Sequence, residues 1–132
     1  GQNLNQVLEL DPSTNQWTAK ASMITGRWAH RLVWFKDRLW AIGGHFGHAS
    51  AIVESYDPLS NTWRTETSLT TTRDWPVTWV AGDKIFAAGG YDGISISNTI
   101  ESYDPSIGQW TNHTWAGGLT KVVGINATDT LL

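Results

Sequence analysis

Residues 54–63 read ESYDPLSNTW, and residues 101–110 repeat the pattern as ESYDPSIGQW. An earlier copy, LDPSTNQW, occupies residues 10–17. The tryptophan that ends each copy recurs after 46 residues and then after 47. Self-similarity at a period of about 40–50 residues is typical of β-propellers, in which each period forms one four-stranded blade. The sequence therefore predicts a repeat fold made of such blades.

Short apolar and aromatic runs alternate with turn residues inside each period, which is typical of β-strands. Lys36-Asp37 and Gly82-Asp83 are predicted tight turns, and proline after Asp57 or Asp104 ends a strand because it has no ladder donor. No stretch shows a sustained helical period. The predicted strands are 6–9, 17–20, 29–35, 38–42, 52–56, 63–67, 77–80, 84–88, 99–103, 110–114, 121–125 and 130–132.

Four landmarks in fixed order resemble the kelch repeat. They are an arginine before the first strand, a glycine pair ending the second, Tyr-Asp-Pro ending the third and a tryptophan in the fourth. The resemblance covers nearly the whole chain and implies an all-β fold of kelch-type β-propeller blades. The matching residues are Arg27, Gly43, Gly44, Tyr56 and Trp63 in one period and Arg73, Gly89, Gly90, Tyr103 and Trp110 in the next.

The chain departs from the repeat at both ends. Leu10 stands where the later copies have tyrosine, and residues 117–119 hold Gly-Gly-Leu where an arginine is expected. The predicted division is strands c and d of a first blade (1–26), two blades (27–72 and 73–118), and strands a and b of a further blade (119–132).

This division amounts to three blade equivalents, whereas closed propellers usually have about four to eight blades. The chain is therefore a partial propeller. Either two copies complete a six-blade ring as a homodimer, or the chain is a fragment of a longer propeller. The second is favoured because the sequence stops within a blade.

The recurrent aromatic residues are expected to be structural, since wide, flat rings suit the wedge between adjacent blades. Structural roles are assigned to the glycine pairs and to Trp17, Tyr56, Trp63, Tyr103 and Trp110. Core or channel packing is also expected for Trp34, Trp75 and Trp79.

The kelch resemblance implies that partners bind the loops between strands d and a and between strands b and c. For Arg27 and Arg73 a purely structural role is equally open, because both recur with the repeat. Trp28, His45 and Phe46 do not recur, and arginine and aromatic residues dominate interaction hot spots. The candidate partner-binding residues are Arg27, Trp28, His45, Phe46, Arg73, Asp74, Tyr91 and Asp92.

Composition excludes several other classes. The 132 residues carry a net charge of −3, without the basic surface of a nucleic-acid-binding protein. No segment approaches the roughly 20 apolar residues of a membrane span. There is no cysteine, which excludes disulfides and thiol catalysis and is compatible with a cytoplasmic location. His45 and His48 lie three apart with no carboxylate in their loop, so no metal or cofactor is expected.

A non-enzymatic protein-interaction module is the function we predict. The repeats are closest in style to BTB-kelch proteins, a resemblance that implies a substrate adaptor in a cullin-3 ubiquitin ligase complex, or actin binding. The alternative is part of a kelch-propeller enzyme or carbohydrate-binding protein. Copper oxidases of that kind need converging His, Tyr or Cys ligands, and His30 and His113 are not expected to converge with the loop histidines.

Overall fold

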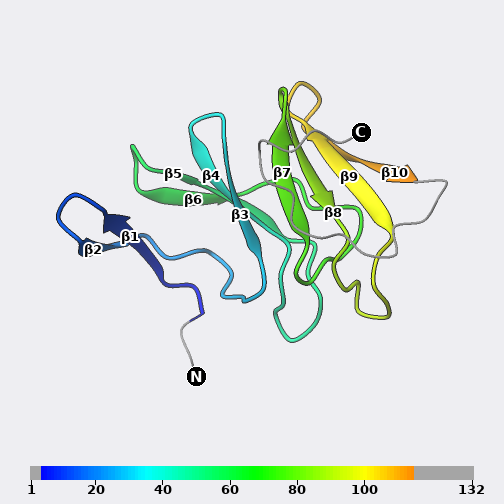
Figure 1. The fold of residues 1–132 in the computed structure, drawn as a ribbon, viewed down its shortest axis with the longest axis horizontal. Coiled ribbons are helices and arrows are strands. Elements are labelled where there is room, and N and C mark those ends of the chain that lie inside the picture. Colours follow the sequence, from blue (N-terminus) through cyan, green and yellow to red (C-terminus); the bar gives the residue numbers. More distant parts are fainter. Residues whose placement is uncertain (1–3, 115–132) are drawn as a thin grey trace.

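A computed structural model describes residues 4–114 of the chain. This part forms ten strands and no helix, and each strand pairs antiparallel with its neighbours (Figure 1). The predicted all-β fold class is therefore confirmed. The strands are β1 (Val7–Asp11), β2 (Gln16–Lys20), β3 (Arg31–Phe35), β4 (Arg38–Ile42), β5 (Val53–Asp57), β6 (Thr62–Thr65), β7 (Val77–Ala81), β8 (Lys84–Ala88), β9 (Thr99–Asp104) and β10 (Gln109–Thr114).

The strands form three sheets in chain order. Strands β3–β6 and β7–β10 make two four-stranded meanders, which we call the first and second complete blades, and β1 and β2 make a hairpin that we call the half-blade. We letter the strands of a complete blade a to d in chain order. The a strands, β3 and β7, lie next to each other, so the complete blades are neighbours. The predicted strands 121–125 and 130–132 lie outside the described residues.

Strand register repeats from sheet to sheet. In the complete blades Tyr56 faces Trp63 and Tyr103 faces Trp110 across strands c and d. In the half-blade Leu10 faces Trp17 in the same way. The half-blade therefore has the geometry of strands c and d of a blade whose strands a and b are not among the described residues.

Turns at one end of the blades are tight. Lys36 and Asp37 both have positive φ, at 48° and 58°, which matches a two-residue hairpin turn between β3 and β4. The c–d turns each begin with an aspartate, and its carboxylate accepts backbone N–H groups two residues further on. Figure 1 shows these turns at the opposite end of the complete blades from the longer loops that join b to c and d to a.

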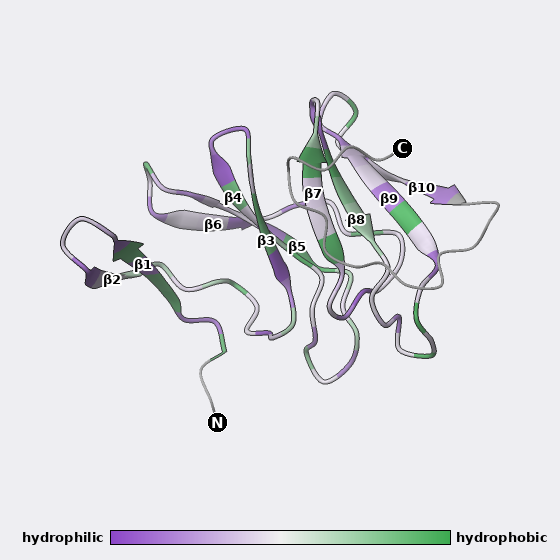
Figure 2. Ribbon diagram, in the orientation of Figure 1, coloured by the Kyte–Doolittle hydropathy of each residue, from purple (hydrophilic) through white to green (hydrophobic). Residues whose placement is uncertain are grey.

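The main hydrophobic core lies between the two complete blades. Trp40 on β4 packs against Tyr103 on β9, with ring centroids 5.1 Å apart. In Figure 2, much of β7 and β8 is hydrophobic, whereas the outer strands β6 and β10 are mainly polar. The blades therefore bury apolar area mainly on strands b and c, and strand d of the second complete blade adds Trp110 to the core. The buried cluster is Phe35, Trp40, Ile42, Val53, Leu69, Ile85, Ala87, Tyr103 and Trp110.

Each strand-d tryptophan of a complete blade binds the blade before it. The indole N–H of Trp63 donates to the carbonyl of Ala21 at 2.8 Å, and that of Trp110 donates to Thr67 at 2.9 Å. Trp17 departs from its expected packing role, because its side chain is 63% exposed. No earlier blade lies among the described residues to receive it.

Candidate partner-binding loops

The long loops at one end of the complete blades carry all the predicted binding residues, although the side chains of the two arginines are buried. Trp28 and Asp74 lie in equivalent d–a loops, and His45 and Tyr91 lie in equivalent b–c loops. Backbone bridges join Trp28 to His45 and Asp74 to Tyr91. In each bridge the two residues exchange both N–H···O bonds, at 2.7–3.2 Å. Each blade therefore fixes its two loops against each other.

Glycine makes this close approach possible. A Cβ on Gly44 would lie 2.6 Å from the carbonyl oxygen of Trp28, and one on Gly90 would lie 2.7 Å from that of Asp74. Both glycines have positive φ, at 103° and 81°. The glycine pairs directly follow β4 and β8, so they occupy equivalent places in neighbouring blades. Their second members position the site, because the d–a loop passes over them.

Four side chains meet across the junction of the two complete blades: Trp28, His45, Asp74 and Trp75, which we call the loop cluster. His45 Nδ1 lies 2.8 Å from Asp74 Oδ2. The ring of Trp28 lies 4.7 Å from that of His45 and 5.7 Å from that of Trp75, the latter edge-on. A backbone bond from Trp75 N to Ala29 O, at 3.0 Å, locks the two d–a loops together.

Exposure within the loop cluster is uneven. Trp28 is 44% exposed and Trp75 61%, whereas Asp74 is 8% exposed and its Oδ1 atom has no hydrogen-bond partner in the described part of the chain. The cluster therefore combines two exposed rings with a mostly buried carboxylate. Such a combination can contact an apolar group through the rings, or attract a cationic group to the rings and the nearby carboxylate.

Phe46, Tyr91 and Asp92 flank the loop cluster on the b–c loops. Phe46 is 56% exposed and Tyr91 41%. The carboxylate of Asp92 accepts the backbone N–H groups of Ser95 and Ile94, and these bonds lower its pKa below the ordinary value. Asp92 therefore holds its own loop in shape and keeps a negative charge there.

Arg27 and Arg73 lie in the blade interior, not on the loop surface. Their side chains are 1% and 0% exposed and form ion pairs with Glu54 and Glu101, at 3.0 Å and 2.8 Å. A side chain without exposed surface does not reach a partner in this conformation, which corrects the surface role considered for both. Their recurrence in the repeat left the structural and the partner-binding roles equally open.

Trp75 is the site residue that sequence reasoning missed. We expected it, with Trp34 and Trp79, to pack in the core or channel. Trp79 does stack on Phe86, at 5.2 Å between ring centroids, but Trp34 and Trp75 are 56% and 61% exposed. The equivalent of Trp75 in the preceding blade is Ala29, so non-recurrence could have identified it. Both residues have positive φ, at 53° and 58°.

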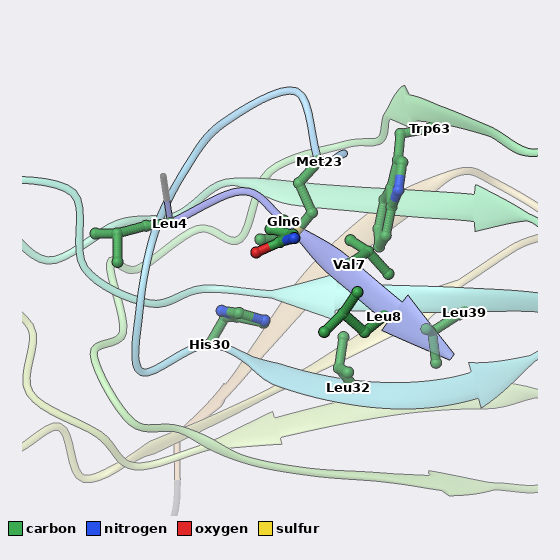
Figure 3. Close-up of a pocket in the computed structure, with 9 residues that line it drawn as sticks. All are labelled: Leu4, Gln6, Val7, Leu8, Met23, His30, Leu32, Leu39 and Trp63. Carbon is green, nitrogen blue, oxygen red and sulfur yellow. The ribbon is translucent and has the colours of Figure 1, made fainter. Parts of the chain in front are cut away.

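A cavity of about 210 Å³ lies elsewhere, between the half-blade and the first complete blade (Figure 3). His30 reaches its wall, and burial, followed by the nearby Arg27 charge, lowers the pKa of the His30 ring. The cavity lies where strands a and b of the half-blade's own blade would pack. Its lining is mainly apolar and comprises Leu4, Gln6, Val7, Leu8, Met23, His30, Leu32, Leu39 and Trp63.

Within residues 4–114, no three His, Asp or Glu side chains gather as metal ligands would. No helix in this described part is long and apolar enough to cross a membrane.

Comparison with known proteins gives a consistent result. The family profile of the Kelch motif matches residues 30–70 and 80–112. Human Kelch-like protein 4 is 41% identical over 66 residues, which are 50% of this chain and 9% of that protein. Mouse Kelch-like protein 35 is 31% identical over 112 residues, covering 83% of this chain and 19% of that protein. Alpha-scruin from Limulus polyphemus is 31% identical over 107 residues, covering 76% and 12%.

Among solved structures, that of YjhT superposes with a TM-score of 0.70 at 19% identity, covering 87% of this chain and 45% of that one. At this identity the match supports the fold alone. The chain spans about a fifth or less of the length of these curated relatives.

Proposed function

Because the chain belongs to the kelch motif family, we propose that it is a protein-interaction module that presents the long loops of its blades to a partner protein. The observation that carries this proposal is the group of exposed aromatic side chains on those loops. Trp28, Phe46, Trp75 and Tyr91 come from four different loops, yet backbone bridges and ring contacts hold them at one end of two blades. Exposed tryptophan and tyrosine are typical of interaction hot spots.

A more specific role follows from the resemblance to Kelch-like proteins. We propose that the full-length protein is a substrate adaptor of a cullin-3 ubiquitin ligase, with the loops contacting the substrate, and that actin is the other candidate partner. A pull-down of the full-length protein with purified cullin-3 and with actin filaments distinguishes these roles. Binding to neither would contradict this finer proposal and leave the interaction module intact.

Loop-specific binding tests the module itself. We expect partner proteins captured by the chain to be lost when Trp28 and Trp75 are both changed to alanine. The matched control is Trp17→Ala plus Trp34→Ala, which removes two equally exposed tryptophans away from these loops. Two outcomes would contradict binding through the loops. One is that the Trp28/Trp75 variant keeps every partner, and the other is that both double variants lose partners equally.

The other class of function is a kelch-propeller enzyme or carbohydrate-binding protein. The His45–Asp74 pair is the feature that favours it, because a carboxylate orients histidine in many catalytic sites. Turnover of a substrate that stops in His45→Gln would replace the binding proposal with this one.

A further inference from the structure

The loop cluster has an electrostatic character as well as an apolar one. In the loops 43–52, 66–76 and 89–98, the acidic side chains are Glu66, Asp74 and Asp92, and the only Lys or Arg is Arg73. Arg73 is buried and neutralised by Glu101. Arg27, in the loop that holds Trp28, is likewise buried and paired with Glu54, and Glu66 is mostly buried and paired with Arg64. The negative charges that remain beside the exposed rings are those of Asp74 and Asp92.

Asp74 is the centre of this arrangement. Its side chain is nine-tenths buried, so its charge is poorly screened by solvent. Oδ2 is held by His45, while Oδ1 accepts no hydrogen bond from any described residue. A buried acceptor without a donor is costly, and such a group in a native fold requires an explanation. Oδ1 is itself covered, so Asp74 acts on a partner through its charge: a cation placed on the neighbouring rings would balance a carboxylate that solvent screens poorly.

The rings around Asp74 indicate which donor fits. Trp28 and Trp75 expose aromatic faces beside the carboxylate, and a guanidinium or ammonium group is attracted by both. The His45 tautomer that donates from Nδ1 to Asp74 leaves Nε2 as a further acceptor. A neutral sugar would use the rings and the carboxylate but would gain nothing from the uncompensated charge of the loops.

Resting on the proposed interaction function, we propose that the loop cluster recognises a positively charged side chain, arginine or lysine, of the partner protein. The cation lies against Trp28 and Trp75, where the nearby charge of the Asp74 carboxylate attracts it. The position equivalent to Asp74 in the preceding blade is Trp28. Among the described residues, the preference for a cation therefore belongs to the junction where Asp74 meets His45.

Selection from a random peptide library displayed on phage tests the proposal without knowledge of the partner. The bait is the 132-residue chain, and counter-selection on Trp28→Ala/Trp75→Ala retains only peptides that need the loop cluster. We expect the retained peptides to share an arginine or lysine. Replacing that residue by citrulline or acetyl-lysine should weaken binding at least about tenfold, since both keep an N–H donor but lose the positive charge that the rings and Asp74 attract.

Variants of the protein complete the test. Asp74→Asn should weaken the same peptide about tenfold. The matched control, Asp83→Asn, makes the same charge change in an exposed turn at the opposite end of the blade and should leave affinity unchanged. If Asp74→Asn does not fold, Trp28→Leu takes its place, because the Trp28 ring is partly exposed. Together with the citrulline form of the peptide, this variant keeps the test decisive.

The outcomes separate this inference from the function on which it rests. Retained peptides without a positive charge would overturn the cation inference and leave the interaction function standing. Recovery of no cluster-dependent peptide would overturn both. Cluster-dependent binding of neutral methyl glycosides, without any cationic peptide, would overturn both in favour of carbohydrate binding. Equal weakening by Asp74→Asn and Asp83→Asn would show that net charge, not the site, governs binding.

Discussion

The two junctions between sheets use the same repeat elements but differ in completeness. Between the first and second complete blades, strands from both sides bury Trp40, Ile42 and Tyr103 in one core. Between the half-blade and the first complete blade, a cavity of about 210 Å³ opens instead, and Leu32 and Trp34 on β3 stay more than half exposed. The repeat therefore specifies a blade, but the burial of its strand-a residues depends on the neighbouring blade: Tyr56 is buried at the open junction, whereas Leu32 and Trp34 are not.

The equivalent arginines differ too, but through residues of their own blades and not through the junctions. Arg73, at the complete junction, donates to Gly89, Ser97 and Thr99 besides its pairing with Glu101. Arg27, at the open junction, donates to Ala41 and Thr25 besides Glu54, and its Nε has no partner among the described residues.

The largest expected effect comes from removing Arg73 from the interior of the second complete blade. Arg73→Met leaves the Glu101 carboxylate buried without its partner, which typically costs about 3–5 kcal/mol of unfolding free energy. We expect Arg27→Met to cost less, because Arg27 makes fewer hydrogen bonds. Urea unfolding of both variants measures this. Equal losses would show that the two junctions hold their arginines equally, and Arg73→Met/Glu101→Met should recover most of the loss.

The two strand-d tryptophans Trp110 and Trp17 differ in burial, and we expect their replacement to differ in its effect on stability. Trp110 is 6% exposed and packs on Tyr103, so Trp110→Ala should lower stability by about 3–5 kcal/mol. Trp17→Ala should change stability by no more than about 0.5 kcal/mol, since its ring contacts solvent. Thermal and urea midpoints of the two variants test the comparison. A large loss from Trp17→Ala would mean that another segment covers it in solution.

The exposed surface at the open junction, formed by β1 and β3, predicts self-association. Within residues 4–114, β1 pairs with β2 alone, and Leu8, Leu32 and Trp34 add apolar surface beside it. We propose that a second copy can complete a six-blade ring here with its own strands. Sedimentation at several concentrations should show a discrete dimer, which Trp34→Lys weakens severalfold. Polydisperse association would favour a fragment of a longer propeller, and a stable dilute monomer would contradict the edge argument.

The fold could be predicted from sequence because its signals are local and repeated. The 46-residue spacing, the glycine pairs and the Asp-Pro turns each act within one blade. The side chains of the loop cluster could not be placed together, since the His45–Asp74 contact joins different blades and depends on their relative packing. Burial of Arg27 and Arg73 was also undecided, because an arginine before a strand reads the same whether its partner is an internal glutamate or another protein.

The smallest expected effect lies in the c–d turns, and it probes the same difference between complete and incomplete blades. Hydrogen bonds from the Ser106 side chain and backbone, with the Lys84 ammonium 3.2 Å away, lower the pKa of Asp104 from 3.8 to about 2. Lys84 comes from strand b. Ser13 lowers the pKa of the equivalent Asp11 as well, but the ion pairs of the described residues include none to Asp11.

Titration of the side-chain carboxyl carbons by NMR should therefore find Asp104 more acidic than Asp11. Because a lowered pKa favours the ionised carboxylate in the folded state, the contribution of Asp104 to stability is present above about pH 4 and is lost as the pH falls towards 2. Lys84→Met should raise the pKa of Asp104 towards that of Asp11 and leave Asp11 unchanged. An unmoved Asp104 would mean that the turn hydrogen bonds alone set its acidity, and that strand b contributes packing to the blade but no charge to its turn.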